Sequence, residues 1–459
     1  MHKRVIGAVV LLATQLAASG FGDDTQKPAS STPDSTATTT PTQSPAGTPG
    51  LDFSPAQYLP SWLQIGGQFR GRLEEPSGTS LINHKADGYY ASRLRATLGI
   101  QATSWLRFFA EAQDARTAGY NAPVAPTTLY NPIDVRQLYV AIGQKENGYL
   151  NWSFRAGRQE LAFGGERLIG PADWGMSRTF DALDLTLGGG DRKVDLLAGS
   201  AVTIDSTRLD RHKPGEHFYG AYGNWKNLLP HLNVEPYLLF KQNLLIKSET
   251  GHIGDALVVS PGIRALGTLP GRFDYIAEGI LQRGSYSTDN VHAVGYSLVG
   301  GWTVANVRWK PRFSAEYSYA SGDKKVKDGE RNTFDQFYPS NHGYYGMIDQ
   351  FGWKNLENVR LGFDFQATSK LKIRSDYNNF YLATVQDSLY GSSGTSVLLN
   401  RSAASSHIGF ETNTIALYQY SKVWKFGAGF GHLFAGDYLK ESKINFGYSY
   451  PYISAVGSF

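Results

Sequence analysis

The chain of 459 residues contains no cysteine and only 3 methionines. The absence of cysteine excludes disulfide bonds, thiolate metal sites and a cysteine nucleophile. No apolar run beyond the N-terminus approaches the roughly 18 residues that a membrane-spanning helix needs. The formal net charge is only +4 and no basic block accompanies it, so nothing indicates nucleic-acid binding. What remains is a chain with 27 Tyr, 24 Phe and 51 Gly, a composition typical of β-proteins with many turns.

Motifs of hydrolytic and nucleotide chemistry are also missing. The 10 histidines and the many serines fall into no G-x-S-x-G elbow, no H-E-x-x-H zinc motif and no P-loop. We therefore expect no enzyme, no cofactor and no metal site. A Ser/His pair on neighbouring strands would escape such a search.

The N-terminal region has the pattern of a secreted protein. Residues 1–20 combine a short basic end, an apolar run of about a dozen residues and a small-residue cleavage region, which predicts a cleaved signal peptide. Residues 21–57 are rich in Ser, Thr and Pro and have few large apolar side chains, so we expect a disordered periplasmic tether. The remaining 58–459 forms the folded domain.

From Trp62 onward, apolar and polar residues alternate in a long series of segments. In the first, WLQIGGQFRGRLE, Ile65 and Phe69 lie on one face of an extended chain, and Arg70 and Arg72 lie on the other. The same period of two recurs to the C-terminus and predicts about eighteen strands. The predicted strands are 62–74, 89–102, 105–116, 134–143, 152–158, 178–187, 193–200, 217–224, 232–241, 257–266, 272–283, 293–302, 310–321, 358–367, 370–381, 407–418, 422–433 and 445–459.

The connections between these strands alternate in length. Long connections such as 75–88, 242–256 and 284–292 are followed by short ones such as 103–104. In an up-and-down meander every second connection lies at the same end, so one end carries loops and the other carries turns. Outer-membrane barrels have this asymmetry, with long extracellular loops and short periplasmic turns. We therefore expect an all-β fold, a single transmembrane antiparallel up-and-down β-barrel in the cell outer membrane, ending at the aromatic Phe459.

One segment resembles a known family. The stretch FRAGRQELAFGGERLIGPADWGMSRTFDAL, residues 154–183, resembles the signature of the alginate export family of outer-membrane barrels. Its Arg-Gln-Glu-Leu and Gly-x-Glu-Arg-Leu-Ile-Gly pieces carry most of the similarity. The segments YYASRLRATLGIQATSWLRFFAEAQDAR, VRQLYVAIG and GAGFGHLFAGDYLK agree with it, so the resemblance extends from about Trp62 to Phe459.

The resemblance implies a monomeric barrel of about eighteen strands. The best-known member of the family passes the anionic polysaccharide alginate through an electropositive lumen, but the likeness does not by itself imply that solute. That exporter also has a long periplasmic turn near its C-terminus that acts as a gate. The matching connection here, Gln419 to Ser421, is short, so we expect no gate of that kind.

Arginines recur on the face that the alternation assigns to the lumen. A barrel of this size encloses a water-filled channel whose selectivity depends on its width and on charged side chains. Guanidinium groups keep their charge and bind carboxylates bidentately, which suits an anionic solute. Acids such as Glu74, Glu111 and Asp376 share that face, so ion pairing that stabilises the wall is the alternative role. The predicted pore-lining residues are Arg70, Arg72, Arg93, Arg95, Arg107, Arg155, Arg360, Lys372 and Arg374.

The connection 159–177 is rich in glycine and charge. One hypothesis is that it folds into the lumen and narrows it, with Glu166 and Arg167 paired to residues such as Arg178 and Asp181. The other hypothesis is that it caps the outer end of the barrel, and the sequence leaves both open. The predicted constriction residues and their anchors are Arg158, Glu166, Arg167, Arg178, Asp181 and Asp184.

These patterns predict an outer-membrane channel for the passive passage of anionic solutes, including acidic saccharides such as alginate-type uronates. The alternative is a structural or adhesive barrel whose loops plug the lumen. The expected partners are outer-membrane lipid, lipopolysaccharide and an anionic small-molecule or oligosaccharide solute.

Overall fold

The computed structural model describes residues 59–77, 81, 87–120, 126–144 and 151–459. The predicted signal peptide 1–20 lies outside the described residues, as does the tether 21–57. Among the described residues, no helix is long and apolar enough to cross a membrane.

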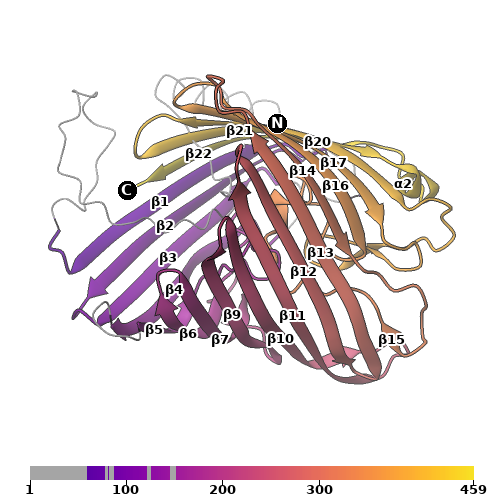
Figure 1. Cartoon of the computed structure of the whole chain (residues 1–459), viewed down its shortest axis with the longest axis horizontal. Helices are drawn as coiled ribbons and strands as arrows, with labels where there is room; N and C mark the ends of the chain where they lie inside the picture. Colours follow the sequence, from indigo (N-terminus) through magenta and orange to yellow (C-terminus); the bar gives the residue numbers. More distant parts are fainter. Residues whose placement is uncertain (1–58, 78–80, 82–86, 121–125, 145–150) are drawn as a thin grey trace.

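Eighteen antiparallel strands of the described chain form one closed barrel, with almost no helix (Figure 1). Each strand pairs with the next one along the wall, and β22 closes the barrel against β1 with Gly457 opposite Phe69. The short β8, β15, β18 and β19 lie in the connections. The strands are β1 (Leu63–Glu74), β2 (Tyr89–Gln101), β3 (Leu106–Ala118), β4 (Asn131–Gln144), β5 (Trp152–Gln159), β6 (Phe180–Gly189), β7 (Arg192–Thr203), β8 (Arg211–His212), β9 (Glu216–Leu229), β10 (Leu232–Lys247), β11 (Ile253–Leu269), β12 (Phe273–Tyr286), β13 (Asp289–Thr303), β14 (Arg312–Ala320), β15 (Glu330–Arg331), β16 (Leu356–Gln366), β17 (Leu371–Leu382), β18 (Leu389–Tyr390), β19 (Ser396–Leu398), β20 (His407–Gln419), β21 (Trp424–Ala435) and β22 (Tyr448–Ser458); the helices are η3 (Asn341–Gly343) and α2 (Asp437–Glu441).

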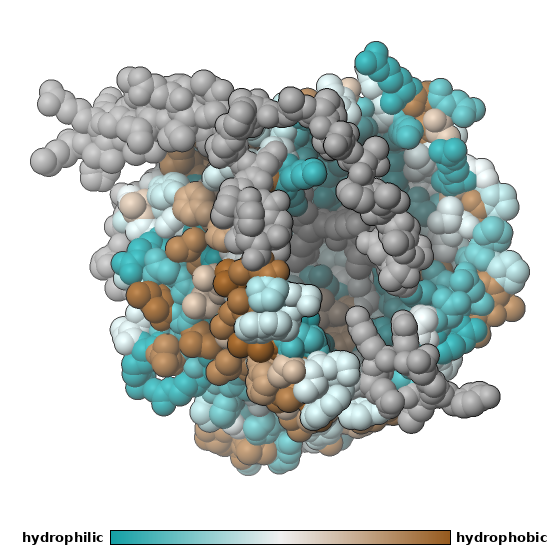
Figure 2. Space-filling view, turned by 90° about the vertical axis from the view of Figure 1, so that its left-hand side faces the viewer, coloured by the Kyte–Doolittle hydropathy of each residue, from teal (hydrophilic) through white to brown (hydrophobic). Residues whose placement is uncertain are grey.

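The alternation along each strand separates an apolar outer surface from a polar interior. Leu298 on β13 is 52% exposed, whereas its neighbour Ser297 is fully buried. On β2, Leu94 is exposed while Arg93 and Arg95 are buried. Figure 2 shows the molecule hollowed on one side, with hydrophilic residues around the hollow and hydrophobic residues gathered on the outer surface. An apolar outer band is the surface that hydrocarbon covers in membrane barrels.

Leu298 lies near the middle of β13 and tests this assignment. We expect Leu298→Arg to lower the free energy of unfolding in lipid vesicles by about 2–4 kcal/mol, because a charge near the bilayer midplane loses its hydration. Leu298→Ala, which removes volume but adds no charge, is the control and should cost less. Urea unfolding followed by tryptophan fluorescence measures both variants. Equal costs for the two variants would contradict a lipid-facing position.

The predicted lengths of two connections are wrong. The strands β10 to β13 continue beyond the predicted ends, so 242–256 shrinks to a connection of 248–252 and 284–292 shrinks to 287–288. Polar residues near the predicted ends hid this continuation, because β12 runs on through Ser285 and Tyr286. Ser287 then turns the chain with a positive φ of 57°. The other long connections remain, including 160–179, 321–355 and 383–406.

Candidate functional site: an inward loop and a charged lumen

The connection 160–179, here called the inward loop, crosses the interior of the barrel. It leaves the wall at β5 and returns at β6, yet Asp173 contacts arginines of β1 and β2. At the loop's other extreme, Arg167 forms an ion pair with Glu316 on β14. These strands lie far apart around the wall, so a single loop reaches both only through the lumen.

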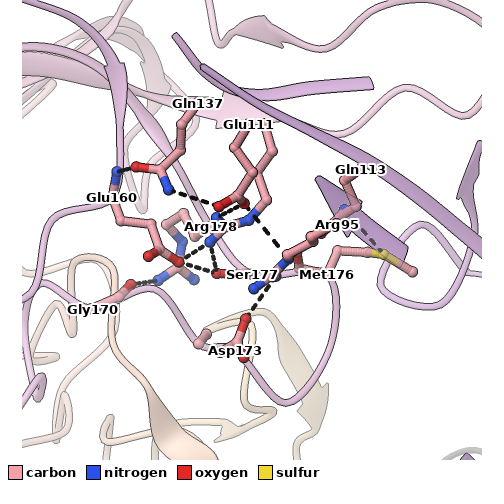
Figure 3. Close-up of polar contacts among 12 residues, drawn as sticks. Arg95, Glu111, Gln113, Gln137, Glu160, Gly170, Asp173, Met176, Ser177 and Arg178 are labelled. Carbon is pink, nitrogen blue, oxygen red and sulfur yellow. Dashed lines mark hydrogen bonds and ion pairs between the residues drawn. The ribbon is translucent and has the colours of Figure 1, made fainter. Parts of the chain in front are cut away.

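Asp173 is held by three arginines of the neighbouring strands β1 and β2. Arg93 binds both carboxylate oxygens, with its Nη1 2.9 Å from Oδ1 and its Nη2 3.1 Å from Oδ2. Arg95 Nη2 lies 2.7 Å from Oδ1 (Figure 3), and Arg70 donates to the carbonyls of Asp173 and Gly175, both at 2.7 Å. Burial alone would raise the pKa of Asp173, but Arg93 and Arg95 outweigh it and hold that pKa well below its usual value.

A second anchor joins the inward loop to β3 and β4. Arg136 on β4 pairs with Glu111 of β3 and with Glu160 at the start of the loop. Ser177 accepts a hydrogen bond of 2.6 Å from Arg136. It donates one of 2.7 Å to Glu160 (Figure 3). This network fixes both ends of the loop against the same wall.

Arg167 is buried at the other side of the lumen, and its partners differ from those expected. It pairs with Glu316, donates a hydrogen bond of 2.8 Å to the hydroxyl of Tyr345, and lies 4.0 Å above the ring of Tyr344. Arg178 and Asp181 are not its partners. Arg178 instead donates to the carbonyls of Gly170, at 3.0 Å, and Pro339, at 3.1 Å. The prediction missed Glu316, Pro339 and Tyr345 because they lie more than a hundred residues away in the sequence.

A second loop, 321–355, joins the inward loop in the barrel interior. The amide of Tyr338 donates to the carbonyl of Leu168 at 2.7 Å, and the amide of Gly170 donates to the carbonyl of Tyr338 at 2.9 Å, as in a short parallel ladder. The ring of Trp174 stacks on His342 with centroids 4.2 Å apart. The two loops therefore form one connected element across the lumen.

The second loop is in turn tied to β16 and β20 of the wall. Arg360 of β16 donates to the carbonyl of Gly343 at 2.8 Å. The buried carboxylate of Glu411 on β20 accepts a hydrogen bond from the amide of Ile348 at 3.2 Å. The connected element is thus held by β1 and β2, by β14, and by β16 and β20.

Beside this element, a cavity of about 1290 Å³ opens in the lumen. Nine Arg or Lys and nine Asp or Glu side chains line it, so its charge depends on which groups neutralise one another. Arg312 pairs with Asp274 at 2.6 Å. Lys372 and Arg374 on β17 share one carboxylate, that of Asp364, at 3.8 and 3.5 Å. Arg72, Glu166, Arg167, Arg178 and Arg360 are also among the lining residues.

The remaining predicted residues fall in different places. Arg155 pairs with Asp184, which lies opposite it on the neighbouring strand β6. Arg107 donates a hydrogen bond to Gln64 at 2.8 Å. Arg158 and Asp181 bind each other, and the structure corrects their assignment. They face outward, because their positions share a side with the exposed Leu138 and Leu183. These two residues therefore neither line the lumen nor anchor the inward loop.

Several residues of the site escaped the sequence analysis. Arg136 and Glu316 follow the inward alternation of their strands and could have been found by it, since the neighbouring Val135 is exposed. Trp174 and His342 lie in loops without a period, and no local pattern indicated them. Glu160, directly after β5, was likewise not selected.

Two Ser–His contacts occur in the part of the chain that the structure describes. Ser200 lies 2.8 Å from His217 and Ser449 lies 2.7 Å from His432, in both cases at Nδ1 of the imidazole. In a hydrolytic triad the serine bonds to Nε2, and Nδ1 is held by an acid. These contacts therefore lack that arrangement. No group of three or more potential ligands that could hold a metal ion was found among the described residues.

Comparison with known proteins agrees with this architecture. The family model described as "Alginate export" matches residues 61–448. A search of proteins with curated function gave no match. Solved structures with a similar fold include Pseudomonas aeruginosa OccK11 (OpdR), with a TM-score of 0.55 and 10% identity over 86% of this chain and 96% of that one. Acinetobacter baumannii OccAB4 gives 0.57 and 10% over 87% and 99%.

The outer membrane protein opdK of Pseudomonas aeruginosa is similar as well, with a TM-score of 0.56 and 9% identity over 86% of this chain and 98% of that one. At these identities the likeness concerns the fold. The fold and the family are those of transport porins and place the protein in the outer membrane. Since the family model spans most of the sequence, the chain belongs to the alginate export family.

Proposed function

We propose that this outer-membrane channel passes anionic solutes passively, including acidic saccharides such as alginate-type uronates. The observation that carries the proposal is the pair Lys372 and Arg374, which line the cavity and share the carboxylate of Asp364. The side chain of Lys372 is 41% exposed, so a solute in the cavity reaches it. Charged groups at a narrow passage favour ions of opposite sign.

The proposal gives the predicted arginines two different roles. Lys372, Arg374 and Arg360 lie at the cavity and provide selectivity. Arg93 and Arg95 of β2 hold the inward loop and thereby set the width of the passage. The cavity residues that we expect to give selectivity lie on β16 and β17. We therefore propose that the solute passes between the loop element and the wall formed by β14, β16 and β17.

The selectivity is tested by Lys372→Glu combined with Arg374→Glu. We expect the reversal potential in a salt gradient across a planar bilayer to move toward that of the cation, because two positive charges at the cavity become negative. The matched control is Lys324→Glu with Lys325→Glu, an equal change of charge on exposed residues of loop 321–355. Cation preference of the unchanged protein, or equal shifts in both variants, would contradict the proposal.

The second candidate is a structural or adhesive barrel with a plugged lumen. It is favoured by the two loops that bond to each other across the interior. The same bilayer recording separates the candidates, because a plugged barrel conducts no ions. For either candidate we propose a monomer that contacts lipid and lipopolysaccharide. We also propose that residues 1–20 are its signal peptide and that residues 21–57 form a tether before the barrel.

A further inference from the structure

The place that Asp173 occupies on β1 and β2 has the geometry of a carboxylate receptor. Arg70 and Arg93 stand opposite each other in the register of the two strands, and Arg95 follows on the same face. Arg93 meets both oxygens of the carboxylate and Arg95 meets one of them. Such a planar, forked arrangement suits two coplanar oxygens better than a spherical ion.

Asp173, which occupies this place, belongs to the inward loop and not to a strand of the wall. The side chain of Asp173 keeps 23% of its surface exposed, whereas that of Arg93 keeps only 2%. The Asp173 side chain is thus the more exposed of the two partners, and its neighbours Ala172 and Trp174 line the cavity. The arginines themselves are fixed by the strands and remain in position when the occupant changes.

We propose that Arg93 and Arg95, with Arg70 beside them, form a carboxylate-binding site in which Asp173 is an internal ligand. A carboxylated solute in the lumen competes with Asp173 for this site and releases the adjoining part of the inward loop. The inference rests on the proposed function only in that a carboxylated solute must enter the lumen. The site would thus make the width of the passage depend on the solute.

The release is local, because other contacts hold the rest of the loop. Arg70 binds backbone carbonyls of Asp173 and Gly175, and these bonds do not need the Asp173 side chain. Arg167 and the ladder at Leu168 and Tyr338 fix the far side of the loop. In Asp173→Ala the loop backbone therefore stays beside the arginines. The space that the carboxylate occupied is then open to a small carboxylic acid.

The absence of cysteine from the chain provides the readout. Met176 is buried beside Gln113, and Met176→Cys places a single thiol at the segment that should move. The rate of its reaction with a water-soluble thiosulfonate reagent reports local opening of the loop. We expect Asp173→Ala to raise this rate by about tenfold, because the segment loses the hydrogen bonds of Arg93 and Arg95 to the carboxylate and keeps only those of the arginines to backbone carbonyls.

Acetate should have opposite effects on the rate of thiol modification in the Met176→Cys proteins with and without Asp173. The ionic strength is kept constant with chloride. With Asp173→Ala, acetate fills the vacant site and slows the reaction; with Asp173 intact it competes and accelerates the reaction. Acetamide, a neutral molecule of the same shape, should do neither. No response to acetate, or a response of the same sign in both proteins, would overturn the proposal.

The control is Asp181→Ala, which removes an acid from the outward side of β6 and should leave the rate and its acetate dependence unchanged. Heat-modifiable gel migration confirms that each variant has folded. If Asp173→Ala fails to fold, Asp173→Asn removes the charge but keeps the volume, and the same signs are expected. Thiol reactivity is independent of ion preference, so failure of this inference and failure of the proposed anion selectivity are separate results.

Discussion

Replacement of residues 163–173 by a short Gly-Ser linker is expected to raise the single-channel conductance by about twofold or more, because the narrowest part of a channel dominates its resistance. This segment includes Arg167 and Asp173, the two residues that reach opposite walls. Without them the loop element loses the ion pair with Glu316 and the carboxylate contacts with Arg93 and Arg95. Planar-bilayer recordings of the refolded protein measure the change.

The control for this replacement is removal of 324–328, an exposed segment of the second loop. It shortens a loop without touching the contacts across the lumen, so conductance should stay at the level of the unchanged protein. A linker variant that folds, as judged by gel migration, and still shows the original conductance would exclude the inward loop as the constriction. A rise in both variants would indicate a general effect of shortened loops.

Arg167→Ala is expected to lower the free energy of unfolding by about 3–5 kcal/mol, since removal of one partner leaves a buried charge without compensation. The side chains of Arg167 and Glu316 are only 4% and 7% exposed. Arg360 lies 3.9 Å from Glu316 and offsets part of the loss. The hydrogen bond to Tyr345 and the contact with the Tyr344 ring disappear as well. Urea unfolding in lipid vesicles measures the difference.

A double-mutant cycle isolates the ion pair from the lost packing. Glu316→Gln in the Arg167→Ala background removes the buried charge, so it should restore part of the stability that Arg167→Ala lost. In the unchanged background, Glu316→Gln should be destabilising. A loss of less than about 1 kcal/mol for Arg167→Ala would mean that water enters the site and solvates Glu316.

The sequence by itself determined the barrel. Alternation of apolar and polar residues is a local property of each strand, and it places Leu94 outside and Arg93 inside whatever the rest of the chain does. The same rule places Arg158 on the side of Trp152 and Phe154, which agrees with its position in the structure opposite the exposed Leu138 and not with the predicted constriction. Strand ends were less certain, because a polar pair such as Asp289 and Asn290 continues β13 without any apolar signal.

Only the tertiary structure decided the site. Arg70 and Asp173 are 103 positions apart, and Arg167 and Glu316 are 149 apart. Such contacts depend on the closure of the wall and on the path of a loop that has no period and hence no local constraint on direction. The inward position of the arginines on β1 and β2 could be predicted from the sequence. Their partner Asp173 could not, because it depends on the path of the loop across the lumen.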